Sequence, residues 1–384
     1  MSKTQHHVVL VPGLFGFAQL GGFDYFVHVE EALGQRYAEA GLECDFVLVS
    51  SPPTGSIVRR AQVLLEAIDE ACGQDDGPIH LIGHSTGGLD IRLLASPTTR
   101  PGLPDWFDRV QTAITVSTPH YGTPLAHDLT TLAGRQLLFA LSLFTFGTLR
   151  FGGLPLSALS PLVASLGKID DALGLDIKVL DRTTDLLLSL LSEEGLSEVR
   201  DWFDGIRADR GAIIQLTPES MDIFNAAVED NPSLRYGCVV TRMPPPAPLK
   251  VASGILSPVG ALSAALFTTL YVGASHPSSV YPSPIPTPEV GDFLTERFGE
   301  PVEPSFNDGL VPTLSQLWGD IVWAGTADHL DILGHFQGDK DLSHTDWQVS
   351  GAGFDEPDFD EAIDAIADFQ VADFRGHAAP QKSL

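Results

Sequence analysis

Short apolar runs alternate with longer amphipathic stretches over the first third of the chain. Runs of about four apolar residues predict buried strands, and apolar residues repeating every three or four positions predict helices. The expected strands are 8–11, 46–49, 79–82 and 113–116, and the expected helices are 26–40, the segment capped by Ser56 and the segment after residue 86. Strands that alternate with helices indicate βαβ units, and hence a parallel sheet with right-handed crossovers.

The alternation stops at about residue 125 and does not resume until about residue 230. The pattern between these positions is helical, and the segments 137–144 and 186–191 are unusually apolar for helices of a soluble protein. We therefore expect residues 125–230 to form an inserted helical cap, or lid, over the carboxyl edge of the sheet. A plain helical subdomain with its own buried core is the alternative.

Strand patterns return at 236–241 and 320–325, and a last helix is expected from about residue 358. We expect an α/β fold with a mostly parallel, doubly wound sheet of about six strands. Its core would comprise residues 1–124 and 231–384, with an irregular Pro- and Ser-rich excursion at about 244–290.

An uncharged stretch, 251–275, is long enough to cross a membrane. Its Ser, Gly and Pro residues favour a buried or interfacial segment, so we expect no transmembrane span. The start of the chain leaves no room for a signal peptide, which predicts a cytoplasmic protein, or a secreted one whose leader has been removed.

Charge and cysteine content narrow the classes of partner. The net charge is −28, from 50 acidic and 22 basic residues, which argues against binding to nucleic acid. Three cysteines, Cys44, Cys72 and Cys238, make an odd count without a close pair and are expected to be reduced thiols. The composition indicates no oligomeric state.

The segment 83–87 reads Gly-His-Ser-Thr-Gly and fits the pattern G-x-S-x-G. An expected strand precedes it and an expected helix follows it, which is the setting of a nucleophile elbow. Ser85 is thus a candidate nucleophile, and the alternative is a structural serine in a tight turn. The negative charge that forms on an attacked carbonyl oxygen needs backbone donors. We expect one from Thr86 and one from the loop 12–14.

A nucleophilic serine needs a histidine base, which an acid must orient. His329 directly follows the last expected strand, at the edge where Ser85 should lie. Asp308 precedes it by enough residues to reach the ring from a separate loop, although its Asn-Asp-Gly setting also suits an exposed turn. Asp328 and Asp331 are too close to His329 in sequence to approach its ring easily.

Together, these segments resemble the bacterial true lipases, which are triacylglycerol lipases of the α/β-hydrolase fold. Residues 118–123 are similar to the family's G-T-P-H-x-G-[ST] stretch, and the segments 9–17, 307–311 and 328–331 look like its oxyanion loop, catalytic Asp and catalytic His segments. Pro12 stands where the family usually has His. The resemblance implies hydrolysis of esters with hydrophobic acyl groups, at a lipid interface or in solution.

The resemblance assigns the triad Ser85, Asp308 and His329, with the backbone N–H groups of Leu14 and Thr86 as the oxyanion hole. A carboxylesterase, a polyester depolymerase or an acyltransferase would use the same triad. A binding protein of the same fold, without turnover, is the alternative from another class.

The family also implies a structural calcium ion, held by the Asp two places after the catalytic His, by an upstream Asp and by a Gln-containing stretch. Asp331 matches the first ligand, but His335 stands at the Gln position and is a poor ligand for Ca²⁺. The upstream Asp has no clear counterpart. We therefore expect no cofactor and no tight metal site, with Asp331 as a weak candidate ligand. The family is typically secreted with a disulfide, and neither feature is visible in this sequence.

Overall fold

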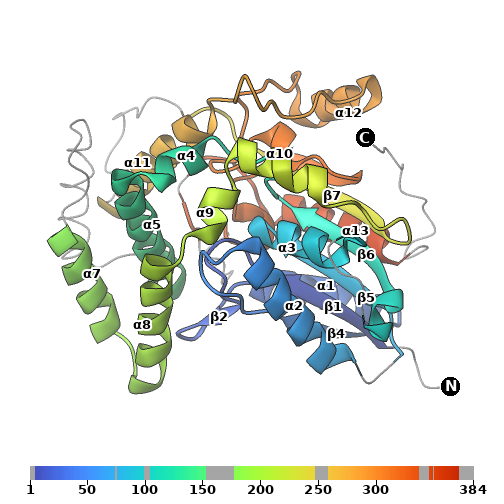
Figure 1. Cartoon of the computed structure of the whole chain (residues 1–384), viewed down its shortest axis with the longest axis horizontal. Coiled ribbons are helices and arrows are strands. Elements are labelled where there is room, and N and C mark those ends of the chain that lie inside the picture. Colours follow the sequence, from blue (N-terminus) through green and yellow to red (C-terminus); the bar gives the residue numbers. More distant parts are fainter. Residues whose placement is uncertain are drawn as a thin grey trace.

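The computed structural model describes residues 5–73, 76–98, 104–152, 177–246, 258–336, 346–348 and 350–371. A six-stranded sheet forms its centre, with every neighbouring pair parallel, in the order β4-β1-β5-β6-β7-β8 (Figure 1). The strands are β1 (Gln5–Val11), β4 (Glu43–Leu48), β5 (Ile79–His84), β6 (Val110–Val116), β7 (Arg235–Arg242) and β8 (Asp320–Thr326). A small antiparallel hairpin joins β2 (Gln19–Leu20) and β3 (Phe23–Asp24). The sheet confirms the predicted α/β-hydrolase fold.

Helices cover both faces of the sheet, because successive residues of a strand point to opposite sides. The helices are α1 (Val27–Glu39), α13 (Glu356–Gln370), α2 (Ile57–Cys72) and α3 (Thr86–Ala95). Val8 and Leu10 of β1 pack in the core that contains residues of α1 and α13. Val9 and Val11 pack in the core that contains residues of α2 and α3. The strands therefore read as continuous apolar runs.

The described part of residues 125–230 is helical. It contains α4 (Leu125–Thr130), α5 (Leu132–Phe151), α7 (Ile177–Ser189), α8 (Glu193–Ala208), α9 (Gly211–Gln215) and α10 (Pro218–Ala227). Helix α5 begins where the Thr131 hydroxyl accepts the Gly134 N–H at 2.9 Å, and it ends at Gly152 with φ of 70°. Figure 1 shows α5, α7 and α8 beside one another at one end of the sheet. The division into core and cap stays a prediction.

Among the described residues, α5 alone is long and apolar enough to cross a membrane, and 72% of its most apolar window is buried inside the protein. The irregular excursion expected at 244–290 is helical in part of its described residues, at α11 (Pro258–Ala274) and the start of α12 (Pro288–Phe298), whereas residues 275–287 form no helix or strand. Each of these helices starts at a proline, where the missing N–H would have no intrahelical partner. The prolines therefore mark helix starts. Three short 3₁₀ helices complete the described fold: Asp105–Arg109, Thr313–Gln316 and Asp331–Leu333.

Candidate active site

Ser85 lies in the sharp turn between β5 and α3. Its backbone has φ of 53° and ψ of −124°, a strained conformation for a residue other than glycine. A Cβ on Gly83 would stand 2.5 Å from the Gly87 carbonyl carbon, and a Cβ on Gly87 would stand 2.3 Å from the Val11 oxygen. The turn therefore requires both glycines of the G-x-S-x-G pattern. This geometry is that of a nucleophile elbow.

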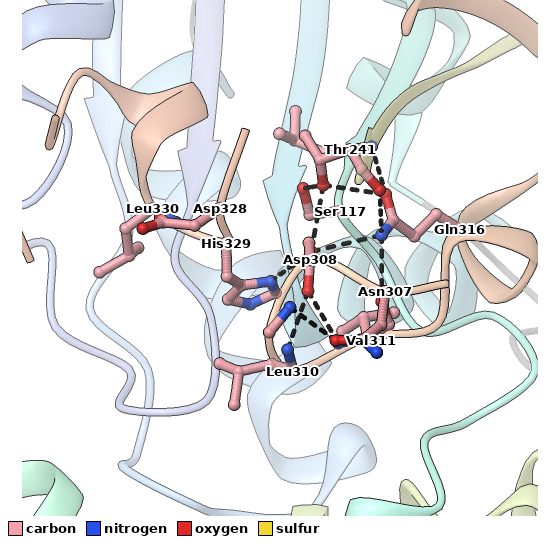
Figure 2. Close-up of polar contacts among 12 residues, drawn as sticks. Ser117, Thr241, Asn307, Asp308, Leu310, Val311, Gln316, Asp328, His329 and Leu330 are labelled. Carbon is pink, nitrogen blue, oxygen red and sulfur yellow. Dashed lines mark hydrogen bonds and ion pairs between the residues drawn. The ribbon is translucent and has the colours of Figure 1, made fainter. Parts of the chain in front are cut away.

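The His329 ring is paired with Asp308, which comes from a separate loop. Nδ1 of His329 lies 2.8 Å from Oδ2 of Asp308, and Asp308 is almost fully buried (Figure 2). The other oxygen of Asp308 accepts the backbone N–H groups of Leu310 (3.0 Å) and Val311 (2.8 Å). An ionised carboxylate only accepts, so His329 donates from Nδ1 and keeps Nε2 free as a base.

Two side-chain donors also contact Oδ2 of Asp308. The Thr241 hydroxyl lies 3.1 Å and the Gln316 amide nitrogen 3.3 Å from Oδ2 of Asp308. Figure 2 shows these side chains, with Ser117 beside Thr241, on the side of Asp308 away from the His329 ring. Thr241 and Gln316 could not be predicted from the sequence, because they belong to no recognisable motif. They fix the direction in which Asp308 points.

Asp328 and Asp331 serve the backbone of the His329 loop instead of its ring. Oδ1 of Asp328 accepts the N–H groups of Leu330 (2.9 Å) and Asp331 (3.0 Å), and Oδ2 of Asp331 accepts the N–H of Asp328 (2.9 Å). These reciprocal bonds form a tight turn around His329. They leave neither carboxylate bonded to the ring, in line with the choice of Asp308.

A third carboxylate, Asp346, joins Asp328 and Asp331, and one oxygen of each lies within 4.8 Å of the others. Burial raises the pKa of Asp328 to about 6 and that of Asp346 to about 8. Burial and the charge of Asp328 also hold the pKa of Asp331 well above its usual range. Oδ2 of Asp328, which is fully buried, has no hydrogen-bond partner among the described residues. Two buried carboxylates beside a half-buried one repel each other, and oxygen donors of this kind suit a hard divalent cation.

His335, the residue at the family's Gln position, does not join this cluster. Its Nε2 lies 2.9 Å from the carbonyl oxygen of Tyr25. The family pattern did not predict this carboxylate cluster, because the pattern requires an Asp upstream of the catalytic His segment. Besides Asp331, the cluster contains Asp328, directly before His329, and Asp346, 15 positions after Asp331.

The loop after β1 contains one backbone N–H, that of Leu14, without a hydrogen-bond acceptor among the described residues. The carbonyl of the Gly13–Leu14 peptide accepts the Gly16 N–H at 3.0 Å, so in this trans peptide the Leu14 N–H points to the opposite side. Among the described residues, nothing accepts a hydrogen bond from this N–H. Thr86 begins α3, so its N–H lacks an intrahelical carbonyl. Both expected oxyanion donors thus remain available.

A buried ion pair that sequence reasoning missed anchors this loop. Arg60 donates to the Pro12 carbonyl at 2.6 Å and to Asp90 at 2.8 Å, and both side chains are fully buried. Burial raises the pKa of Asp90 to about 7, although the Arg60 charge lowers it. Arg60 lies on the buried face of α2, where a charged residue is unusual. This unusual position is the only feature of the sequence that indicates its role.

His84 and Tyr25 connect the elbow to the His329 loop. Nε2 of His84 lies 2.8 Å from the carbonyl oxygen of His329, so this nitrogen carries the proton. Burial lowers the pKa of His84 well below its usual range, which keeps the ring neutral. Its Nδ1 therefore accepts from the Tyr25 hydroxyl, 2.9 Å away. His84 thus packs beside the nucleophile and positions the backbone of His329.

Ser85 and His329 line one narrow cavity of about 80 Å³. Its walls are largely apolar and include Leu125 and Leu129 of α4, Leu138 and Leu141 of α5, Ile213 of α9, and Leu14, Leu216, Leu310, Val311, Leu330 and Trp347. The Trp347 indole donates to the Thr145 hydroxyl of α5 at 3.0 Å. Phe144 is buried but does not line this cavity. The largely apolar lining suits an apolar group beside Ser85.

No protein-family model matches the chain. Over 126 residues it is 33% identical to a triacylglycerol lipase of Vibrio cholerae, and over 127 residues it is 30% identical to one of Pseudomonas fragi. Each alignment covers 33% of this chain, and 36% and 39% of the respective relative. The chain thus spans little more than a third of the length of the curated relatives it matches.

Among solved structures, EstA from Clostridium botulinum superposes with a TM-score of 0.50 at 19% identity. The match covers 94% of this chain and 88% of that one, and it concerns the fold. Over a third of its length this chain is thus similar in sequence to bacterial triacylglycerol lipases, and over most of its length its fold is similar to that of EstA.

Proposed function

We propose that this protein hydrolyses carboxylic esters with hydrophobic acyl groups through an acyl-enzyme on Ser85. One observation carries the proposal. A strained serine and a histidine paired with a buried aspartate at 2.8 Å line the same apolar cavity. The partial sequence similarity to triacylglycerol lipases supports the same reaction class.

The reaction begins when Nε2 of His329 takes the proton of the Ser85 hydroxyl, whose oxygen attacks the ester carbonyl carbon. Asp308 holds the ring in the required tautomer and stabilises the imidazolium. The N–H groups of Leu14 and Thr86 donate to the carbonyl oxygen as it gains negative charge. His329 then protonates the leaving alcohol, and the acyl group remains on Ser85.

Water completes the cycle by the same steps. His329 takes a proton from a water molecule, the resulting hydroxide attacks the acyl carbon, and Ser85 leaves with the proton returned by His329. If an alcohol replaced water, the same residues would perform acyl transfer, so the acceptor decides between a hydrolase and an acyltransferase.

The cavity walls favour an apolar acyl chain. Seven of the 21 lining residues come from α4, α5 and α9, within the region expected to form the cap, and the walls offer few polar groups to a small polar substrate. The access of bulky polymers depends on the same helices, so a polyester depolymerase would need them to move. We infer that α5, through Leu138 and Leu141, supplies the surface on which the acyl chain lies.

Rates on p-nitrophenyl esters from acetate to palmitate test this proposal, with and without an emulsified interface. Increasing kcat/KM with chain length up to an optimum is the expected result. A preference for acetate over all longer esters would favour a short-chain carboxylesterase. The absence of turnover together with ligand retention would favour a binding protein of this fold.

We further propose that Asp328, Asp331 and Asp346 hold a divalent cation such as Ca²⁺. This revises the expectation from the sequence, since Asp328 and Asp346 provide donors that the pattern lacked. The unpartnered oxygen of Asp328 supports the assignment. The cation would play a structural role, because these residues build the turn around His329. Calcium titration followed by calorimetry, with the variant Asp346→Asn as the control, tests it.

A further inference from the structure

A second cavity shares the lining residue Leu138 with the cavity that contains Ser85. It has a volume of about 340 Å³ and lies between α5, α7 and α8, which Figure 1 shows next to one another. Its apolar lining is made by Leu138, Phe139, Leu180 and Ile206, all of them buried. Leu138 lines both this cavity and the catalytic one, so a single side chain forms their shared wall.

Three arginines line the same cavity: Arg135, Arg207 and Arg210. This grouping is unusual in a chain with 22 basic and 50 acidic residues. Arg207 donates to Asp181 at 2.8 Å and lies over the Phe139 ring at 4.2 Å, so it is already partnered. Arg135 and Arg210 form no ion pair with any described residue. The cavity therefore has two guanidinium groups available for a ligand.

An apolar lining with two free guanidinium groups is complementary to an anion that carries an apolar chain. Guanidinium groups bind carboxylates through paired hydrogen bonds, while burial of the chain against the leucine and isoleucine side chains contributes the hydrophobic part. We propose that this cavity, here called the arginine cavity, binds the carboxylate of a long-chain fatty acid. Such an acid is the product that the proposed hydrolysis releases next to Leu138, so this identification rests on the proposed function.

Binding can be measured without turnover in the Ser85→Ala variant. The probe is palmitate with a ¹³C-labelled carboxylate, followed by NMR, and 1-hexadecanol is the uncharged comparison ligand. The double variant Arg135→Gln/Arg210→Gln removes both free charges from exposed or half-buried positions. Arg200→Gln, an exposed change on α8 outside the cavity lining, is the matched control.

Palmitate should bind about tenfold or more weakly to the double variant, as expected for the loss of charge-assisted hydrogen bonds. The affinity for 1-hexadecanol and the effect of Arg200→Gln should remain within about twofold of the parent. Unchanged palmitate affinity in the double variant would overturn the proposal. An equal loss for 1-hexadecanol would overturn it as well, since the arginines would then act without recognising the charge.

A second experiment separates the two cavities. Wild-type protein is first labelled on Ser85 with a hexadecyl phosphonate, which fills the catalytic cavity, and palmitate binding is then measured. Retained binding that the two arginine substitutions weaken supports the arginine cavity, and complete loss of binding contradicts it. If Ser85 is not labelled, the proposed hydrolysis fails, whereas the Ser85→Ala titrations still decide whether the arginine cavity binds a carboxylate.

Discussion

Replacing Asp308 by Asn should remove most activity while it preserves the fold. Oδ1 of Asp308 accepts two backbone N–H groups, from Leu310 and Val311, so the single oxygen of an asparagine will occupy that position. Its NH₂ group then takes the place of Oδ2, 2.8 Å from Nδ1 of His329. A donor at that place forces Nδ1 to accept, and the His329 proton moves to Nε2. The ring then has no free base facing Ser85.

The expected loss in kcat is roughly 10⁴, the size that follows when a triad histidine is held in the wrong tautomer. That factor corresponds to about 5.5 kcal/mol of transition-state stabilisation. The KM should change little, because Asp308 does not line the cavity that receives the substrate. The change in volume is negligible, but the NH₂ group also faces the Thr241 and Gln316 donors, so the melting temperature should fall while the fold is kept.

The assay is the initial rate on p-nitrophenyl butyrate, with Asp328→Asn and Asp331→Asn as matched controls. Each control removes a carboxylate near His329 that bonds to the backbone instead of the ring. They should lose far less rate and more thermal stability than Asp308→Asn. If Asp331→Asn abolishes activity while Asp308→Asn is mild, the acid has been misassigned and the lipase resemblance loses its most specific support.

Three further outcomes are expected. Leu138→Asn should reduce kcat/KM on palmitate esters more than on acetate, whereas Phe144→Tyr, outside the cavity lining, should not discriminate between them in rate assays. EDTA should lower the melting temperature by several degrees, and an unchanged melting curve would contradict the cation site. In EDTA the Asp346→Asn variant should be more stable than the wild type, because the substitution relieves repulsion among the three carboxylates. Burial lowers the pKa of His80 to about 3, below its unfolded value of about 6.5. The stability that depends on neutral His80 should therefore be present above pH 6.5 and lost towards pH 3. In the His80→Gln variant, the free energy of unfolding should depend less steeply on pH over this range.

Local patterns carried enough information for the sheet, the elbow and the acid–histidine pair. Each strand reads as an apolar run because both of its faces are covered, and Gly83 and Gly87 are required by distances of 2.5 Å and below. The 20 residues between Asp308 and His329 span a short 3₁₀ helix, one strand and loops, so chain order placed both residues at the same edge of the sheet.

Contacts between distant segments could not be predicted in the same way. Arg60 reaches the Pro12 carbonyl and Asp90, and Gln316 reaches Asp308, through tertiary packing that leaves no periodic trace. Asp346 lies near Asp328 although 18 positions separate them in the sequence, and no spacing pattern indicates this contact. Within 244–290 the prediction missed α11 and the start of α12, because a proline can either begin a helix or interrupt one and the sequence does not distinguish the two.

The catalytic role of Ser85 is tested most directly by a fluorophosphonate probe, followed by peptide mass spectrometry. The probe reacts with a serine only when a base activates it and an oxyanion hole receives the phosphoryl oxygen. One adduct per chain is expected, on the peptide that contains Ser85, with parallel loss of esterase activity and no labelling of Ser85→Ala. An unmodified Ser85 in a protein that still hydrolyses esters, or an adduct on another serine, would contradict the proposed mechanism.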